Sequence, residues 1–265
     1  MPSKTPSPPA LVHAALTVVG RVRQHNEDAL LCQPRLGLWA VADGMGGHRR
    51  GEVASALGLE TLRKRIARGD DLLRAIHCAN EAILSAAKEE DGSRGMGTTL
   101  VAVRFQGADF QLAWVGDSRA YRVGAGSIEQ LSRDHSWVQA MVDAGRMSPE
   151  EAGRHPRRNV VTQCLGQEGL DLDVDSLEGT LGRDELLLLC SDGLTRELSD
   201  ARIQEVCARA GTLEELVSEL VDTANRMGGN DNISCIVLGL APSSSESLPE
   251  RPRGFLDKLF KPAKT

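Results

Sequence analysis

The sequence predicts an α+β domain in which helices cover antiparallel sheets. Nine apolar runs have the length of strands, and four longer stretches repeat apolar residues with helical spacing. Short turns join the runs at 99–105, 110–116 and 120–123, and turns of that length connect only antiparallel neighbours. We therefore expect these three runs to form a meander. We also expect helices to cover the sheets, because most of the strands are too apolar to face water.

The expected elements follow one another along a single domain. Strands are expected at 15–20, 29–33, 38–42, 99–105, 110–116, 120–123, 170–177, 185–190 and 233–240. Helices are expected at 51–68, 72–88, 136–145 and 213–227. No linker interrupts residues 11–240, so we predict one domain there, after a Pro/Ser-rich disordered segment at 1–10.

Residues 241–265 form a separate tail in this prediction. A Ser/Pro-rich linker is followed by FLDKLFK, whose apolar residues fall on one side of a two-turn helix. From residue 250 onward, five basic residues stand against two acidic ones. Two turns bury too little apolar area for firm membrane binding, so we expect this tail to dock on a protein partner.

Composition restricts the function classes. The net charge of −6 and an aromatic content of 3% argue against a nucleic-acid surface, which needs a basic field. The six cysteines contain no CxxC pair, and no apolar stretch approaches the length of a transmembrane helix. We therefore expect a cytoplasmic protein without a transmembrane segment, and a monomer.

Acidic residues lie at the ends of the apolar runs. Those that lie just past the C-terminal end of a run are Asp43, Asp117 and Asp192. Those that lie just before the N-terminal end of a run are Glu27, Asp28 and Asp231. In antiparallel sheets the two kinds of strand end share an edge, so all six acids can meet at one rim.

Such a cluster of carboxylates predicts a metal site. Carboxylates packed together repel one another and raise each other's pKa unless positive charge lies among them. Oxygen ligands without a Cys/His cluster favour Mg²⁺ or Mn²⁺ over zinc, and the backbone at Gly44 can offer a carbonyl as a further ligand. The alternative for each aspartate taken alone is ordinary turn chemistry, because Asp-Gly and Gly-Asp are common turn dipeptides.

Eight motifs in order resemble those of the metal-dependent Ser/Thr protein phosphatases of type 2C, most closely the compact bacterial members. They are RVRQHNEDALL, VADGMGGH, GTTL, WVGDSRAYR, SRDHS, HPRRNVVTQCLG, LLLCSDGL and GGNDNISCIVL, and the resemblance covers about residues 14–240. It implies a four-layer α-β-β-α sandwich with two antiparallel sheets flanked by helix pairs. It also implies hydrolysis of phosphoserine and phosphothreonine in proteins by direct attack of a metal-bridging hydroxide, in opposition to a bacterial Ser/Thr kinase.

The resemblance also implies the metal ligands, with Mn²⁺ or Mg²⁺ as two core ions and a weaker third. Asp43 would bridge the two core ions, and the Gly44 carbonyl would bind one of them. Asp192 and Asp231 would hold the other core ion. Asp117, together with Asp192, would contribute to the third site.

Further roles follow from the same resemblance. Arg23 would bind the substrate phosphate, Glu27 would hold water around the metals, and Asp28 would support them. In eukaryotic members a histidine that directly follows Asp-Gly is proposed as the general acid; here Met45 takes that position and the histidine comes at His48. His48 is therefore a candidate general acid, with capping of the helix start as the alternative.

Residues 136–167 correspond to the flap beside the active site in this family. The segment RHPRRN at 154–159 gathers arginines in one short loop of an acidic protein. Arg157 and Arg158 are thus candidates for holding a phosphopeptide near the metals, and a solvated surface loop is the alternative.

Three rival interpretations remain beside this one. CSDGLTR at 190–196 matches the Cys-x5-Arg pattern of cysteine-dependent phosphatases, but the acidic Asp192 would repel both thiolate and phosphate. A catalytically inactive regulatory or scaffold module of the same fold is the second, although such relatives usually lose metal-binding acids. A two-metal nuclease is the third, and it lacks the basic groove that nucleic acid requires.

Overall fold

The structure is a computed structural model that describes residues 10–46, 50–89 and 95–241. The N-terminal segment before residue 10, the tail after residue 241 and His48 lie outside the described residues. None of the helices within the described ranges is long and apolar enough to cross a membrane.

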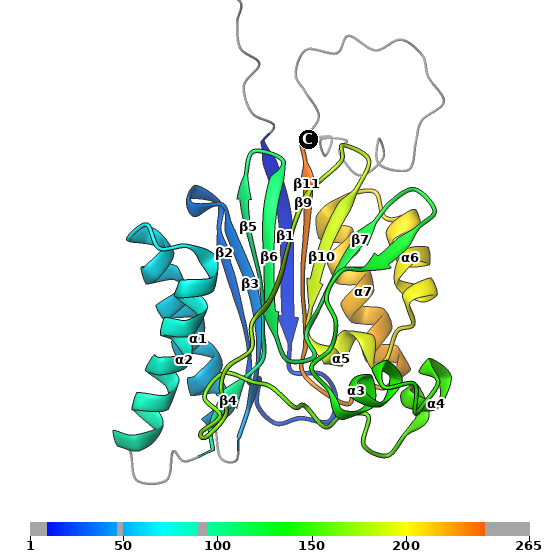
Figure 1. The fold of residues 1–265 in the computed structure, drawn as a ribbon. Helices are drawn as coiled ribbons and strands as arrows, with labels where there is room; N and C mark the ends of the chain where they lie inside the picture. Colours follow the sequence, from blue (N-terminus) through cyan, green and yellow to red (C-terminus); the bar gives the residue numbers. More distant parts are fainter. Residues whose placement is uncertain (1–9, 47–49, 90–94, 242–265) are drawn as a thin grey trace, which may run out of the picture.

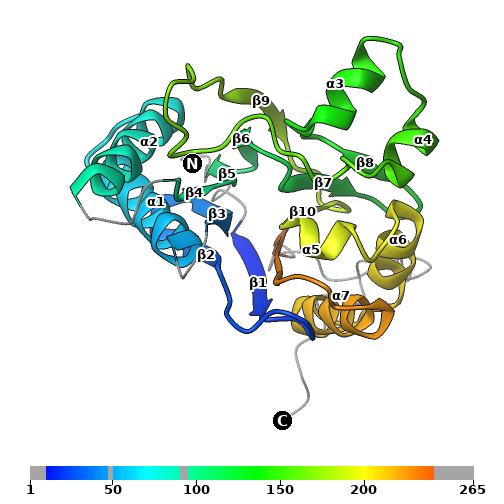
Figure 2. The same cartoon turned by 90° about the horizontal axis from the view of Figure 1, so that it is seen from below.

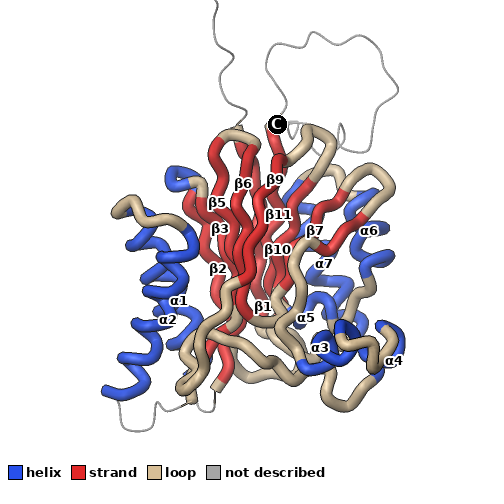
Figure 3. The backbone as a smooth tube through the Cα atoms, viewed as in Figure 1, coloured by secondary structure: helices blue, strands red, loops and turns tan. Residues whose placement is uncertain are grey.

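Two antiparallel sheets pack face to face between two pairs of helices (Figures 1 and 3). The first sheet runs, in order, through β1 (Leu11–Val18), β11 (Ile233–Leu240), β10 (Leu186–Cys190), β7 (Arg119–Val123) and β8 (Ile128–Gln130). The second runs through β2 (Asp28–Gln33), β3 (Leu38–Met45), β5 (Leu100–Gln106), β6 (Asp109–Val115) and β9 (Asp175–Thr180), with β4 (Gly97–Thr98) paired to β3. The expected α+β sandwich is confirmed.

Helices cover the outer face of each sheet (Figures 1 and 2). The pair α1 (Arg50–Ala67) and α2 (Leu72–Glu89) packs on the second sheet, and the pair α6 (Asp200–Arg209) and α7 (Leu213–Met227) packs on the first. The short helices α3 (Trp137–Asp143), α4 (Pro149–Arg154) and α5 (Asp192–Thr195) lie near one end of the sandwich, and a 3-10 turn at Pro34–Leu36 precedes β3.

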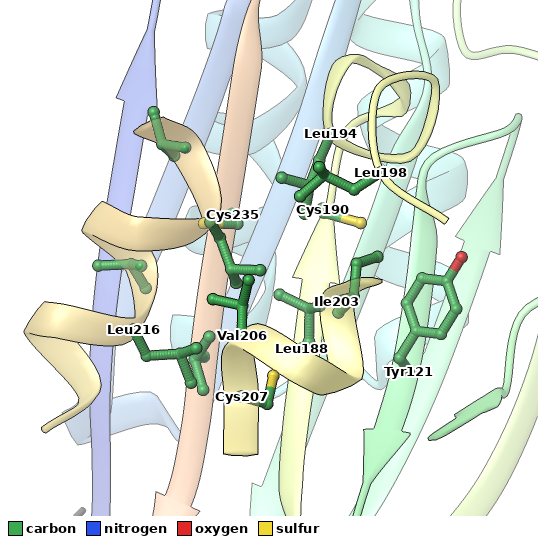
Figure 4. Packing of buried hydrophobic residues seen from close by; sticks show 14 of the residues in the cluster. Tyr121, Leu188, Cys190, Leu194, Leu198, Ile203, Val206, Cys207, Leu216 and Cys235 are labelled. Atoms are coloured by element: carbon green, nitrogen blue, oxygen red, sulfur yellow. The ribbon is translucent and has the colours of Figure 1, made fainter. Parts of the chain in front are cut away.

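Alternation along the strands builds three apolar layers. On β11, Cys235 and Val237 face the α6/α7 pair, whereas Ile236 and Leu238 face the second sheet. Both faces are therefore buried, and β11 reads as a continuous apolar run rather than an alternating one. Figure 4 shows the layer between the first sheet and the α6/α7 pair, in which Leu188 and Cys190 of β10 and Cys235 of β11 lie beside residues of α6 and α7.

Side-chain caps explain where α6 and α7 begin. The Ser199 hydroxyl accepts a hydrogen bond from the Arg202 amide at 3.4 Å, and Thr212 accepts one from the Glu215 amide at 3.1 Å. The sequence pattern missed α6, although Ser199 followed by an acidic first turn is a signal for a helix start. It also missed β4, β8, α4 and α5, which are too short to show a period.

The expected strand at 170–177 was wrong in its first half. The strand is β9, and it begins only at Asp175. Leu172 and Val174 pack against the layer beneath α1 and α2 instead of continuing the pairing with β6. The alternating pattern is thus satisfied by a partly buried loop.

The expected three-strand meander was also wrong. β5 and β6 do pair, but β7 leaves that sheet and pairs with β10 and β8 of the other one. The second edge of β6 is taken by β9. The chain changes sheets at the corner Gly116–Ser118, where Gly116 adopts a φ of 106°.

Gly116→Ala tests this corner. A Cβ on Gly116 would lie 2.6 Å from the Thr99 methyl carbon, whereas a Cβ on Gly107, at a φ of 69° in the β5–β6 turn, would meet nothing within 4 Å. We expect Gly107→Ala to lower the free energy of unfolding by about 1 kcal/mol, for the left-handed backbone alone. Gly116→Ala should cost about 3 kcal/mol, since Thr99 must also move. Urea unfolding measures both, and equal losses would contradict the proposed crowding.

Candidate metal centre

The structure brings the acids of both sheets to one end of the sandwich. Asp43 lies near the C-terminal end of β3, Asp117 lies in the corner after β6, and Asp192 begins α5. Asp28 begins β2 directly opposite Asp43 in the register. Asp231 lies two residues before β11, so residues from each sheet and from the connection between them share this end.

Asp28 ties the two sheets together. Its Oδ2 accepts hydrogen bonds from the hydroxyls of Ser191, at 2.8 Å, and Ser234, at 2.6 Å. Both partners belong to the first sheet or its continuation, whereas Asp28 belongs to the second. Burial raises the pKa of Asp28 to about 6, and its Oδ1 is buried without a hydrogen-bond partner.

Asp43 lies at the centre of the charge cluster. Burial is the main cause that raises its pKa well above the usual value, followed by the charges of the four aspartates Asp28, Asp192, Asp117 and Asp231. Its backbone is held on both sides: the Asp43 amide donates to Thr99 Oγ1 at 3.2 Å, and its carbonyl accepts from the Thr99 amide at 2.8 Å.

Gly44 is required by packing. A Cβ at this position would lie 2.2 Å from the Gly51 carbonyl oxygen and 2.5 Å from the Glu27 carbonyl oxygen. Its amide donates to that Glu27 carbonyl at 3.1 Å. The N-terminal end of α1 therefore lies directly against β3, which explains the glycine by close approach of two backbones.

The corner residues position Asp117. Thr99 Oγ1 and Ser118 Oγ share a hydrogen bond of 2.7 Å, which joins the corner to the end of β3. The Gly116 amide donates to His135 Nδ1 at 3.3 Å, so the ring proton lies on Nε2, 3.2 Å from Asp175. Burial raises the pKa of Asp117 to about 6, and its Oδ1 is buried and unpartnered.

Two arginines pair with Asp231, and one of them also reaches Asp192. Arg23 donates to Asp231 Oδ2 at 2.8 Å, and Arg196 donates to the same oxygen at 2.9 Å and also pairs with Asp192. The pKa of Asp192 lies well above its usual value, first because of burial and then because of Asp117. The sequence interpretation did not include Arg196, although a basic residue four positions after an acid on a helix is a recognisable pair.

Asn232 holds the loop that carries Arg23 and Glu27. Its side-chain amide donates to the carbonyls of Val19 and His25, each at 2.9 Å, and its carbonyl oxygen accepts from the Glu27 amide at 2.8 Å. Asn232 was absent from the predicted site. Its position next to Asp231 in GGNDN was the only sequence signal.

In the flap, defined as residues 136–167, the two candidate arginines lie in different surroundings. Arg157 lies over the Trp137 ring at 5.1 Å, and Trp137 also contacts the His155 ring at 4.9 Å. Arg158 instead lines a cavity of about 400 Å³ together with Asp117, Asp192 and Arg196. It also lines a second cavity of about 270 Å³ together with Arg23 and Asp231. Of the two, Arg158 faces the acids.

Cys190 has no access to a substrate. It ends the buried strand β10, and burial raises the pKa of its thiol. A nucleophilic cysteine needs a lowered pKa and partial exposure. The Cys-x5-Arg interpretation is therefore unsupported by this geometry.

The residues at this rim suit a hard divalent cation. In the described part of the chain, no three His, Cys, Asp or Glu side chains already stand together as a ligand set. Mg²⁺, however, commonly binds one or two carboxylates and keeps several waters. Three carboxylates at the rim each have a raised pKa and one buried oxygen without a hydrogen-bond partner: Oδ1 of Asp28, Asp117 and Asp192. A bound cation would give such oxygens a partner and would stabilise the charged form of the carboxylates.

Comparisons with known proteins agree with this chemistry. Residues 20–237 match the family described as Protein phosphatase 2C. The chain is 37% identical over 232 residues to a serine/threonine phosphatase, stp, of Listeria innocua, covering 83% of this chain and 92% of that protein.

Solved structures show the same fold. The crystal structure of the Mycobacterium tuberculosis serine/threonine phosphatase PstP/Ppp matches with a TM-score of 0.81 and 37% identity, over 87% of this chain and 98% of that chain. A structure of the PstP catalytic domain in complex with 2 manganese ions matches with a TM-score of 0.76 and 36% identity, over 87% and 98% of the two chains.

The buried acids predict a pH dependence of stability in chelator. Because the folded pKa of Asp117 is about 6 and the usual value is 3.8, the folded state binds the proton more tightly than the unfolded state. Its contribution to stability is therefore lost as the pH rises through this window. We expect Asp117→Asn to stabilise the chelated protein by about 2 kcal/mol at about pH 8 and hardly at all at about pH 4. Urea unfolding with EDTA measures this.

The exposed Asp171 provides the matched control. Asp171→Asn should leave the unfolding midpoint unchanged at both pH values. An Asp117→Asn protein that is less stable than the parent at about pH 8 would show that burial of this charged carboxylate does not destabilise the folded state.

Proposed function

The chain belongs to the protein phosphatase 2C family, and on that premise we propose which of its residues carry the reaction. It is a protein-serine/threonine phosphatase that depends on Mn²⁺ or Mg²⁺. The observation that carries the assignment of residues is the rim of buried, mutually repelling carboxylates beside two guanidinium groups.

The acids divide between the ions as follows. Asp43 and the Gly44 carbonyl, with Asp192 and Asp231, would hold two core ions, and Asp117 with Asp192 would hold a weaker third. Bound ions would supply Lewis-acid charge to the phosphoryl oxygens and activate water. The unpartnered oxygens of Asp117 and Asp192 support this division.

Arg23 is the proposed phosphate clamp. Its side chain is half exposed and extends from the loop before β2. Burial alone would lower the pKa of Arg23, but the hydrogen bond and charge of Asp231 outweigh it, so the group stays charged. A planar guanidinium can bind two phosphoryl oxygens at once, which aligns the phosphoserine with the acids.

The remaining candidates would support the metal site or the reaction at it. Glu27 directly precedes β2 and would order water around the ions. Asp28 fixes β2 against the first sheet through Ser191 and Ser234. His48 lies outside the described residues and remains the candidate that protonates the leaving oxygen.

The substrates are phosphorylated proteins, and the opposing enzyme would be a Ser/Thr kinase of the same cell. A reducing, cytoplasmic setting is supported by the cysteines, all of which are free. We further propose that the enzyme acts as a monomer on residues 11–240, and that the tail at 241–265 docks on a protein partner.

Asp192→Asn separates the metal mechanism from the cysteine mechanism. The amide keeps the shape of the side chain but loses the charge that holds a cation, so we expect Mn²⁺-dependent hydrolysis of p-nitrophenyl phosphate to fall at least about a hundredfold. Cys190→Ser should retain most of the turnover, because the thiol is buried. The reverse pattern would assign catalysis to the cysteine, and a parent protein inactive in Mn²⁺ would indicate a scaffold.

Arg158→Ala tests the flap. Since Arg158 lines the cavities beside the acids, we expect kcat/KM for a phosphopeptide to fall about tenfold, with little change for p-nitrophenyl phosphate. Arg157→Ala is the matched control, because Arg157 lies over Trp137 instead. Equal losses on both substrates would mean that Arg158 supports the site rather than the peptide.

A further inference from the structure

Arg196 makes an unusual contact for a residue outside the predicted site. One guanidinium group joins the two acids, Asp192 and Asp231, that we assign to a single core ion. The parallel case, Arg23, reaches only Asp231. Arg196 is therefore the side chain in the described site that bridges this pair.

The backbone holds Arg196 in place. It directly follows α5, and its amide donates to the Asp192 carbonyl at 2.8 Å, one helical turn back. Buried Leu194 and Leu198 anchor the segment on either side. The Arg196 side chain is 28% exposed, against 51% for Arg23, so Arg196 has less freedom to turn toward solvent.

The guanidinium uses oxygens that a cation also needs. Asp231 Oδ2 already accepts from Arg23 and Arg196, and Asp231 Oδ1 accepts from the Asn232 amide at 2.9 Å. On Asp192, the Oδ2 atom pairs with Arg196, which leaves Oδ1 unpartnered. A divalent ion on this pair would share carboxylates with a fixed positive charge and would be repelled by it.

We propose that Arg196 is a built-in counter-cation of the Asp192–Asp231 pair: it stabilises the pair when divalent metal is scarce and weakens its affinity for the ion. The guanidinium compensates the buried charge without a metal, and it must move or share its oxygens when the ion binds. Arg196 is thus a positioning residue that sets the metal concentration at which the site fills. This inference rests on the proposed function, because it assumes that these two acids bind an ion.

Arg196→Gln in the full chain tests the inference by two readouts other than activity. Isothermal titration with Mn²⁺ should show about tenfold tighter binding, the size expected for losing one charged hydrogen-bonding competitor. The Tm in EDTA should fall, because the buried Asp192 and the partly buried Asp231 lose their compensating charge. The matched control is Arg202→Gln on α6, where the arginine pairs with Glu205. This variant should bind Mn²⁺ as the parent does, and the difference between its Tm in Mn²⁺ and its Tm in EDTA should equal that of the parent.

Arg196→Lys covers the case in which Arg196→Gln does not fold. A lysine keeps the charge but cannot present the two-armed fork, so Mn²⁺ should bind more tightly than to the parent, by a smaller factor. Equal or weaker Mn²⁺ binding by the folded variant overturns the inference. Asp192→Asn separates the proposed ion site from the proposed role of Arg196. If this variant binds Mn²⁺ as the parent does, the proposed ion site itself is wrong.

Discussion

Repulsion among buried carboxylates at one end of the sandwich is the constraint on which the rest of the structure depends. Asp43 and Asp192 have their pKa values raised by burial and by their acidic neighbours. Such an arrangement opposes folding, so the surrounding structure has to hold it. Two kinds of contact hold the cluster together: serine hydroxyls donate hydrogen bonds to Asp28, and two arginines pair with Asp231.

The packing of the two sheets provides that support, because the acids come from both of them. Asp28 and Asp43 belong to the second sheet, whereas Asp192 and Asp231 flank strands of the first. Three apolar layers fix the sheets relative to each other, and the hydrogen bonds of Asp28 join them at the rim. A rigid core thereby positions charges that would otherwise separate, which is what pre-organisation at a catalytic centre requires.

The positive groups at the rim differ in how firmly they are held. Arg23 extends from a loop that Asn232 anchors, Arg158 reaches the cavities from the flap, and Arg196 is tied to α5. An exposed guanidinium such as Arg23 suits a group that must meet a substrate, whereas the less exposed Arg196 suits a group that compensates the enzyme's own acids. This difference, rather than the number of arginines, separates their proposed roles.

By itself the sequence determined the apolar strands, most of the longer helices, the acids at strand ends and the family, because these depend on patterns within a few neighbouring residues. The run at 233–240 and the helix at 213–227 have the expected bounds. Only the tertiary structure decided that β7 joins the first sheet and that Gly44 packs on Gly51. It alone also brought Arg196 and Asp231 into contact, 35 residues apart. Such contacts arise when distant segments are packed together, and no local pattern encodes the position of the second partner.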